Sequence, residues 1–170
     1  MKAYYQDFLI RDWEKSDRTD AYCVISSVLA EYGLGREPTG ADRDVLEVEN
    51  FYLSRGGEFW VISQQGQLVG TGGYYPVSRG EKAVEIRKMY LLPGVRGLGL
   101  GKFLLQQLEQ AIAARGFEQI WIETASVLVE AVKLYESSGY LPAQGVETAR
   151  CDRVYVKIRS QETGVRRQEL

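Results

Sequence analysis

The chain contains no histidine and only two cysteines, Cys23 and Cys151, among its 170 residues. Without histidine, a catalytic triad of the serine–histidine type is excluded, and the commonest metal ligand is missing. The two cysteines lie far apart, and no dense carboxylate cluster replaces them as a metal site. In a reducing compartment, such cysteines are expected to be small core residues rather than a disulfide. The sequence therefore predicts chemistry without a metal or a histidine base.

Long apolar runs are also missing, and neither sign of charge dominates. No segment has the roughly eighteen consecutive apolar residues of a membrane-spanning helix, and no basic start leads into an apolar signal core. The 21 basic and 23 acidic residues leave a formal net charge of −2, which gives no global field for nucleic acid or an anionic membrane. We therefore expect a cytoplasmic protein, monomeric or homodimeric, that binds neither nucleic acid nor membrane.

Hydrophobic periodicity divides the chain into strands and helices. The expected order is a strand at 8–13, helices at 17–32 and 42–53, strands at 58–63, 67–76 and 82–91, a helix at 99–115, a strand at 119–124, a helix at 127–137, and strands near 140 and at 154–158. This order predicts a mixed α/β fold with an antiparallel front and a strand–helix–strand crossover at the back. The length suits a single domain, expected over residues 1–160, with a polar C-terminal tail at 161–170.

A glycine-rich segment joins the strand at 82–91 to the helix at 99–115. Residues 96–102 are Arg-Gly-Leu-Gly-Leu-Gly-Lys. Glycine lets the backbone turn tightly and present N–H groups to an anion, and at a helix start these groups lack intrahelical partners. Arg96 and Lys102 add side-chain charge. The segment therefore predicts a cradle for a pyrophosphate, with affinity that comes mainly from the backbone.

Two other phosphate loops fail on spacing. A Walker loop needs glycine five residues before Gly101, where Arg96 stands, and a hydroxyl after the lysine, where Phe103 stands. A dinucleotide fingerprint that starts at Gly97 would need glycine at Lys102, and it would open the first strand–helix–strand unit of a chain. A nucleotide-binding module is therefore disfavoured.

What remains is Arg-x-x-Gly-x-Gly at 96–101, which resembles the pyrophosphate loop of the GCN5-related N-acetyltransferase (GNAT) family. Two flanking segments strengthen the resemblance. Residues 85–91, Glu-Ile-Arg-Lys-Met-Tyr-Leu, resemble the fourth strand of the family, and residues 131–140 resemble its Ala-x-x-Leu-Tyr-x-x-x-Gly-Phe segment, with Tyr140 as the last residue. The resemblance implies a mostly antiparallel central sheet, flanked by helices, whose fourth and fifth strands splay apart where they end near Leu91 and Thr124.

The same resemblance implies that acetyl-coenzyme A (acetyl-CoA) is the cosubstrate, with its pantetheine arm in this gap. The implied cofactor-binding residues are Met89, Tyr90, Leu91, Arg96, Gly97, Leu98, Gly99, Leu100, Gly101, Lys102, Thr124 and Tyr135. One position departs from the family pattern, because Leu128 stands where many members have an asparagine that contacts the coenzyme. Thr124 or Ser126 would have to replace that contact.

Three catalytic roles follow from the resemblance. Glu85 resembles the general base; its alternative is a strand carboxylate on a solvated face, paired with Arg87 or Lys88, and Glu123 is the rival base. The main-chain N–H of Leu91 is the implied donor to the thioester oxygen. Tyr135 stands where the family has the tyrosine that protonates the leaving thiolate, and its alternative is a buried aromatic residue whose hydroxyl binds a backbone carbonyl.

The sequence thus predicts an N-acetyltransferase without a metal, which moves acetyl from acetyl-CoA to a primary amine of a small molecule or peptide by direct attack in a ternary complex. The alternative is a non-catalytic acyl-CoA-binding or sensor domain. In this fold the first two helices cover the acceptor, so Glu31, Tyr32 and the loop at 33–40 are expected to face Tyr74 and Tyr75.

Overall fold

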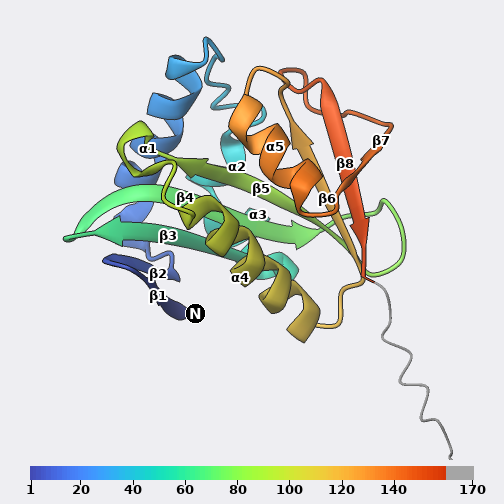
Figure 1. The fold of residues 1–170 in the computed structure, drawn as a ribbon, viewed down its shortest axis with the longest axis horizontal. Helices are drawn as coiled ribbons and strands as arrows, with labels where there is room; N and C mark the ends of the chain where they lie inside the picture. Colours follow the sequence, from blue (N-terminus) through green and yellow to red (C-terminus); the bar gives the residue numbers. More distant parts are fainter. Residues whose placement is uncertain (160–170) are drawn as a thin grey trace, which may run out of the picture.

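A computed structural model of the protein describes residues 1–159, so the predicted tail at 161–170 lies outside the described residues. Eight strands form one sheet in the order β1-β2-β3-β4-β5-β6-β8-β7 (Figure 1). The strands are β1 (Lys2–Tyr5), β2 (Phe8–Asp12), β3 (Glu58–Gln64), β4 (Gln67–Pro76), β5 (Ala83–Leu91), β6 (Gln119–Thr124), β7 (Leu141–Ala143) and β8 (Arg153–Ile158). The helices are α1 (Arg18–Glu31), α2 (Arg43–Leu46), α3 (Val48–Phe51), α4 (Leu100–Ala114) and α5 (Val129–Ser137). The mixed α/β prediction is confirmed.

The sheet is antiparallel except where β5 pairs with β6. Helix α4 makes the crossover between these two strands, as the sequence predicts for a strand–helix–strand unit. The hairpin between β3 and β4 turns on Gln65 and Gly66, whose φ angles of 51° and 78° are both left-handed. Such a two-residue turn matches the twist of the strands that it joins.

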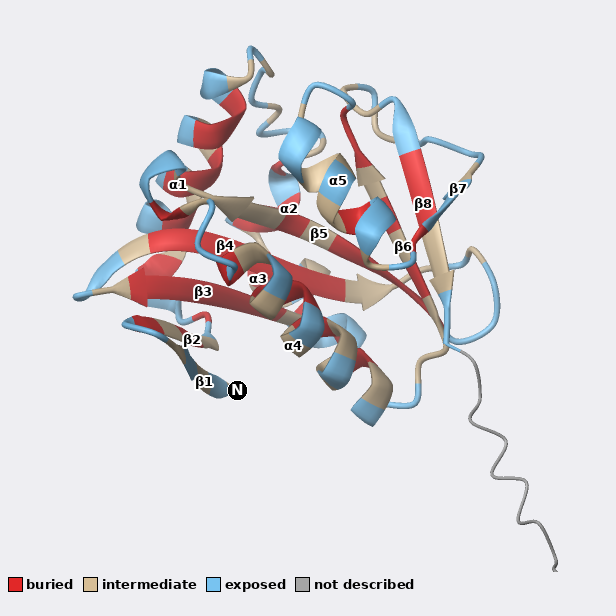
Figure 2. Ribbon diagram, in the orientation of Figure 1, coloured by how far each residue is buried: buried red, intermediate tan, exposed pale blue. Residues whose placement is uncertain are grey.

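Two apolar layers enclose the sheet, which is buried along most of β3 and β4 (Figure 2). On one face, α4 buries a stripe at helical spacing that comprises Leu100, Leu104, Leu105, Leu108 and Ile112. On the other face, α1, α2 and α3 pack around Ala21, Ile25, Leu29, Val45 and Val48. Each face of β5 therefore contacts a different set of helices.

Strand β5 carries a bulge near its middle. Arg87 lies opposite Gly73 and Tyr90 lies opposite Thr71, so Lys88 and Met89 together face one residue of β4. Lys88 has a φ of 53°, and its carbonyl accepts a hydrogen bond from the Thr71 hydroxyl at 2.7 Å. A bulge of this kind bends a strand and increases its local twist.

Two elements differ from the sequence-based expectation. Strand β1 is not predicted, because its four residues form an edge strand and its turn uses Gln6 at a φ of 50° in place of glycine. The single helix expected at 42–53 is wrong, since the backbone leaves the helical conformation at Glu47, with φ −128° and ψ 51°, and two four-residue helices result. Among residues 1–159, no helix has the length and apolar character to cross a membrane.

Candidate active site

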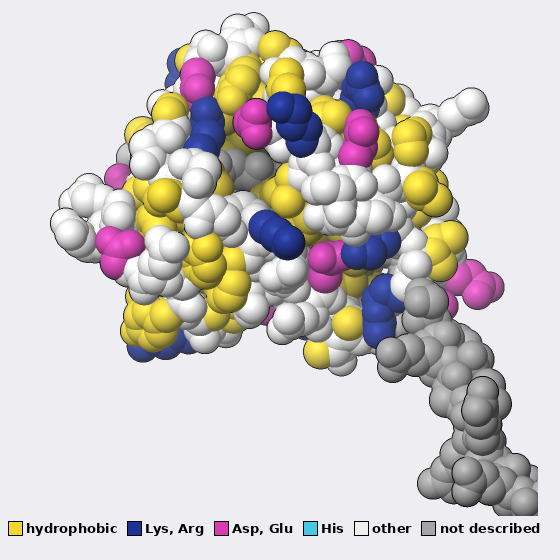
Figure 3. Space-filling model, viewed as in Figure 1, with side chains coloured by type: hydrophobic (Ala, Val, Ile, Leu, Met, Phe, Trp, Pro, Cys, Tyr) yellow, Lys and Arg dark blue, Asp and Glu magenta, His cyan; other side chains and the backbone are white. Residues whose placement is uncertain are grey.

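The pairing of β5 with β6 stops halfway along β5. The last paired residues are Ile86 and Ile122, and both strands continue beyond them without pairing to each other. A cavity of about 330 Å³ lies at this divergence, lined by both strands, the start of α4 and the inner side of α5. The space-filling view shows a recess on this face with charged side chains at its border (Figure 3). The splayed sheet expected from the family resemblance is therefore present.

The register of β5 turns the main chain of Leu91 towards this cleft. The Leu92 N–H donates to the Val69 carbonyl at 2.9 Å, and Leu91 lies opposite Gly70. Because antiparallel strands alternate between hydrogen-bonded and non-hydrogen-bonded pairs, the Leu91 N–H and carbonyl point away from β4. That direction leaves the N–H available to a ligand in the cleft.

The glycine loop ends at the N-terminus of α4. Gly97 and Gly99 have φ angles of 77° and 84°, and Gly99 is the N-cap residue of the helix. The first main-chain N–H of this helix to find a main-chain acceptor is that of Phe103, which donates to Gly99 at 3.1 Å. The preceding N–H groups of the helix therefore have no main-chain acceptor within residues 1–159, which is the arrangement that binds anions at helix starts.

Arg96 is engaged by protein groups on both sides of its guanidinium. Its Nη1 and Nη2 atoms lie 2.7 and 2.8 Å from the two carboxylate oxygens of Glu31, and its Nε donates to the Leu91 carbonyl at 2.9 Å. The Tyr32 hydroxyl lies 3.1 Å from Nη1. Arg96 therefore links the phosphate loop to the end of α1, and its charge is already paired.

Glu85 is buried, with 4% of its surface exposed, and it lines the cleft. Its Oε1 accepts a hydrogen bond from Arg87 Nη1 at 3.1 Å. Burial raises the pKa of Glu85, while the positive charge of Arg87 opposes that rise. A carboxylate with a raised pKa is better matched to proton transfer near neutral pH than an exposed one.

Glu123 also lines the cleft, but protein groups occupy both of its oxygens. Oε2 lies 3.0 Å from Arg79 Nη2, and Oε1 accepts the main-chain N–H groups of Glu147 and Thr148 at 2.7 and 3.1 Å. These bonds hold the side chain in place. Of the two candidate bases, Glu85 has fewer partners.

Tyr135 lies at the cleft wall on α5, with 4% of its surface exposed. Its ring packs against Tyr140 and Tyr155, with centroid distances of 6.1 and 6.3 Å. Within residues 1–159, no protein group is hydrogen-bonded to its hydroxyl, so the backbone-carbonyl partner of the purely structural alternative is absent. Burial raises the pKa of Tyr135 well above its ordinary value, which keeps the hydroxyl protonated at neutral pH.

The cleft brings together most of the predicted site residues. Lining it are Glu85, Met89, Tyr90, Leu91, Arg96, Gly97, Gly99, Gly101, Lys102, Thr124 and Tyr135. Two predicted residues are not at its wall: Leu98 is 45% exposed, and Leu100 is buried in the core beneath α4. Leu128 lines the cleft, whereas the Ser126 hydroxyl is hydrogen-bonded to Asp152 at 2.5 Å.

One of the residues expected at the acceptor site, Tyr74, lies elsewhere. Tyr74 belongs to the core under α4, where its hydroxyl binds Glu58, so it does not face the loop at 33–40. Tyr75 is on the α1 side, and its ring lies 5.5 Å from the Arg87 guanidinium. Glu31 points to Arg96 at the phosphate loop.

A buried charge cluster at this side was not predicted. Asp42 accepts two hydrogen bonds from Arg150 at 2.7 and 2.6 Å and lies 3.5 Å from Lys88 Nζ. Asp44 lies 3.1 Å from Lys88 Nζ through Oδ1, which makes an ion pair but no well-aligned hydrogen bond. The four residues come from the α1–α2 connection, α2, β5 and the loop before β8, and only their burial distinguishes them from surface charges. The sequence gives no such signal.

The splayed strands, the glycine loop at the start of α4 and the buried carboxylate and tyrosine are the arrangement that the family resemblance implies. The model of the acetyltransferase (GNAT) family matches residues 10–140, and the chain belongs to this family. The Escherichia coli (strain K12) protein YjgM, described as an uncharacterized N-acetyltransferase, is 41% identical over 121 residues, which are 69% of this chain and 72% of YjgM.

Solved structures agree on the fold. An acetyltransferase of the GNAT family from Staphylococcus aureus Mu50 superposes with a TM-score of 0.83 at 21% identity, covering 89% of this chain and 98% of that one. The acetyltransferase yncA from Salmonella typhimurium, solved with its cofactor acetyl-CoA, has a TM-score of 0.71 at 18% identity, covering 93% and 97%. The chain therefore has the same fold as these acetyltransferases.

Proposed function

We propose that the protein is an N-acetyltransferase that moves acetyl from acetyl-CoA to a primary amine by direct attack in a ternary complex. The observation that carries the proposal is the convergence of Glu85, the Leu91 N–H and Tyr135 on one cleft. Membership of the GNAT family and the acetyl-CoA-bound relative support the choice of acyl donor. The identity of the amine stays open.

Acetyl-CoA fits the residues that are present. The free N–H groups from Gly97 to Lys102 would hold the pyrophosphate, and the unpaired edge of β5 at Met89–Leu91 would pair with the amides of the pantetheine arm. Lys102 is exposed at the loop and adds a positive charge. Because Arg96 is paired with Glu31, we expect the backbone to supply most of the phosphate affinity.

Three groups of the chain serve the reaction. Glu85 takes the proton that the amine loses when its nitrogen bonds to the acetyl carbon. The Leu91 N–H donates to the carbonyl oxygen as negative charge develops on it, which is typically worth about 10² to 10³ in rate. Tyr135 gives its proton to the thiolate released when the carbon–sulfur bond breaks, and water restores the phenol.

The experiment is a thiol-release assay with acetyl-CoA and a panel of primary amines. We expect turnover with at least one amine, and Glu85→Gln should lower kcat by roughly 10² to 10⁴ at neutral pH. That loss should shrink as the pH approaches the pKa of the amine, since the base is then no longer needed. Glu123→Gln is the matched control. If Glu123→Gln shows this behaviour instead, the base is Glu123; binding of acetyl-CoA without turnover on any amine would favour the non-catalytic alternative.

A further inference from the structure

Arg87 is a buried cation that touches the proposed base but has no role in the steps above. Glu85 and Arg87 lie two residues apart on β5, and their side chains meet on the side of the sheet that faces α1 and α2. The Arg87 side chain is 15% exposed, and that of Glu85 is 6% exposed. A contact between two such groups is weakly screened by solvent.

Arg87 is itself held from three other directions. Its Nε lies 3.4 Å from Asp44 Oδ2, and its Nη2 donates to the Ala41 carbonyl at 3.3 Å. Its guanidinium lies over the Tyr75 ring at 5.5 Å. Asp44 in turn accepts a hydrogen bond from the buried Tyr52 hydroxyl at 2.5 Å. The arginine is therefore fixed before any ligand binds.

The other groups that face Glu85 are few. On the neighbouring strands, Tyr75 of β4 and Trp121 of β6 lie opposite it in register, and the negative charge of Glu123 on β6 raises the pKa of Glu85. Arg79, from the β4–β5 connection, is ion-paired with Glu123 at 3.0 Å, and its positive charge also lowers the pKa of Glu85, by less than that of Arg87. Of these groups, only Arg87 makes a hydrogen bond to the Glu85 carboxylate.

We infer that Arg87 is a positioning residue, which fixes the orientation of the Glu85 carboxylate in the cleft and holds that carboxylate ionised against its burial. The inference rests on the proposed function only in naming Glu85 as the base. Because arginine is charged at every working pH, Arg87 supplies this effect constantly. Burial by itself favours the protonated carboxyl, and a protonated carboxyl cannot take up the amine proton.

The test is a direct titration of Glu85 in the whole protein. Glutamate side-chain carboxyls are labelled with ¹³C, and the Glu85 signal is assigned as the one missing from Glu85→Gln. In Arg87→Met we expect its titration midpoint to move up by about 1 to 3 pH units, the usual effect of an opposite charge at this distance. Arg150→Met is the matched control, because it removes a buried arginine of the same cluster that touches Asp42 and not Glu85.

A second variant guards against unfolding, since Arg87→Met alone leaves Asp44 short of a partner. The double variant Arg87→Met with Asp44→Asn removes both charges, and the new amide still accepts the Tyr52 hydroxyl. An upward shift in either folded variant, absent in Arg150→Met, supports the inference. An unchanged midpoint, or an equal shift in the control, overturns it.

Kinetics on the same proteins separate the two proposals. In the pH profile of kcat/KM, the fall on the acidic side should shift by as much as the titration midpoint of Glu85, and this fall should be absent in Glu85→Gln. If the midpoint moves and this fall does not, the positioning role of Arg87 stands and the assignment of Glu85 as base fails.

Discussion

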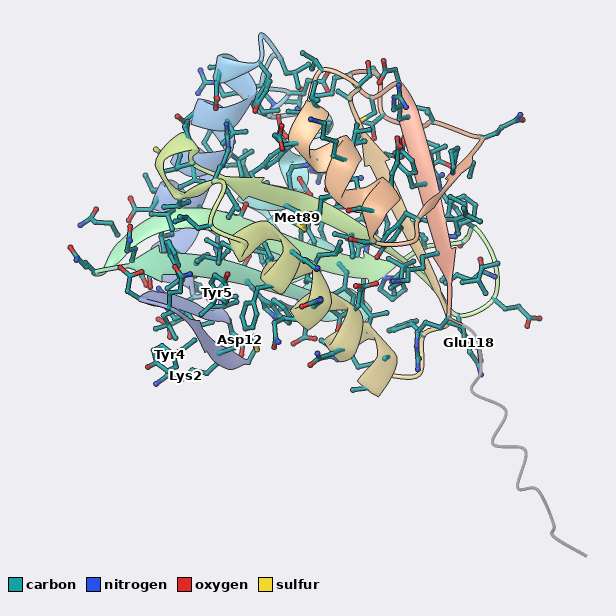
Figure 4. All side chains as sticks on the ribbon, in the orientation of Figure 1. Lys2, Tyr4, Tyr5, Asp12, Met89 and Glu118 are labelled. Atoms are coloured by element: carbon teal, nitrogen blue, oxygen red, sulfur yellow. The ribbon has the colours of Figure 1, made fainter. Side chains whose placement is uncertain are left out.

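A methyl group at Gly99 tests the phosphate loop most sharply, because the structure gives two separate costs for it. Gly99 has a φ of 84°, in the left-handed region that side chains disfavour. A Cβ built there would also lie 2.5 Å from the hydroxyl oxygen of Tyr5. Tyr5 projects from β1 towards the start of α4 (Figure 4), stacks on Phe103 at 4.8 Å and donates to the Leu98 carbonyl at 2.6 Å.

The matched control is Gly97→Ala. Gly97 has nearly the same φ, 77°, but nothing within 4 Å of its added Cβ. Its cost is therefore the backbone strain alone, about 1 to 2 kcal/mol. Gly99→Ala adds the displacement of Tyr5 and the loss of its hydrogen bond, about 1 kcal/mol more. For a chain of this length each kcal/mol lowers Tm by about 2 to 4 °C.

The contact with Tyr5 is isolated by a double-mutant cycle. Tyr5→Phe alone should cost about 1 kcal/mol for its hydrogen bond. In Gly99→Ala with Tyr5→Phe the clash is gone and that bond is lost only once, so the double variant should unfold no more easily than Gly99→Ala. Urea unfolding of the four proteins measures this non-additivity. Full additivity, or equal costs for Gly97→Ala and Gly99→Ala, would refute the contact.

Acetyl-CoA binding gives the functional readout of the same variants. The added methyl at either glycine stands where the backbone must approach a pyrophosphate, so the ligand-induced rise in Tm should shrink in both. An undiminished rise in both would show that the loop does not hold the ligand.

Three further expectations concern residues around the cleft. Tyr135→Phe should lower kcat and kcat/KM together by about 10², because the hydroxyl acts in the transition state. Its Tm should barely change, because the hydroxyl has no protein hydrogen-bond partner within residues 1–159. Near-normal turnover would show that Tyr135 has only a packing role. Glu31→Gln should release Arg96 from its ion pair and raise the affinity for acetyl-CoA by roughly two- to fivefold in a titration. Weaker binding would show instead that the ion pair stabilises the conformation in which the loop binds the ligand. Burial disfavours ionised Asp42, but Arg150, the Glu37 N–H and Lys88 outweigh it and lower its pKa. The stability that ionised Asp42 contributes is therefore present above its ordinary pKa of about 4 and is lost as the pH falls through the lower pKa of the folded state. Asp42→Asn should unfold at lower urea concentration at about pH 7, and it should lose less stability than the unchanged protein on acidification to about pH 3. An equal loss of stability in both proteins would contradict this.

The order of the main elements was predictable because hydrophobic spacing follows the helix and strand periods. Leu100 to Ile112 on α4 and the three antiparallel strands are examples of this local signal. The glycine loop was also predictable from local sequence, since the glycines that allow its tight turn lie within a few consecutive residues.

The charge cluster was not predictable, because its members come from distant parts of the chain. Asp42 and Arg150 are 108 residues apart, and each stands in a segment whose composition is typical of a surface loop. The pairing of Arg96 with Glu31 was missed for the same reason. Sequence spacing identifies groups that act through one segment, whereas ion pairs between loops depend on how the segments meet.

The bulge in β5 amounts to one extra residue in the strand. From Glu85 to Leu91 the strand advances six residues, while the residues opposite them, Tyr75 and Gly70, are five apart. The surplus residue is Lys88, and removing it would leave every pairing with β4 in place while straightening the strand towards β6. Lys88 lies two residues past Ile86, the last residue of β5 that pairs with β6, so we expect the extra residue to help turn β5 away from β6. A one-residue deletion at Lys88 should therefore narrow the cleft, and weaker binding of acetyl-CoA in a titration is the expected result.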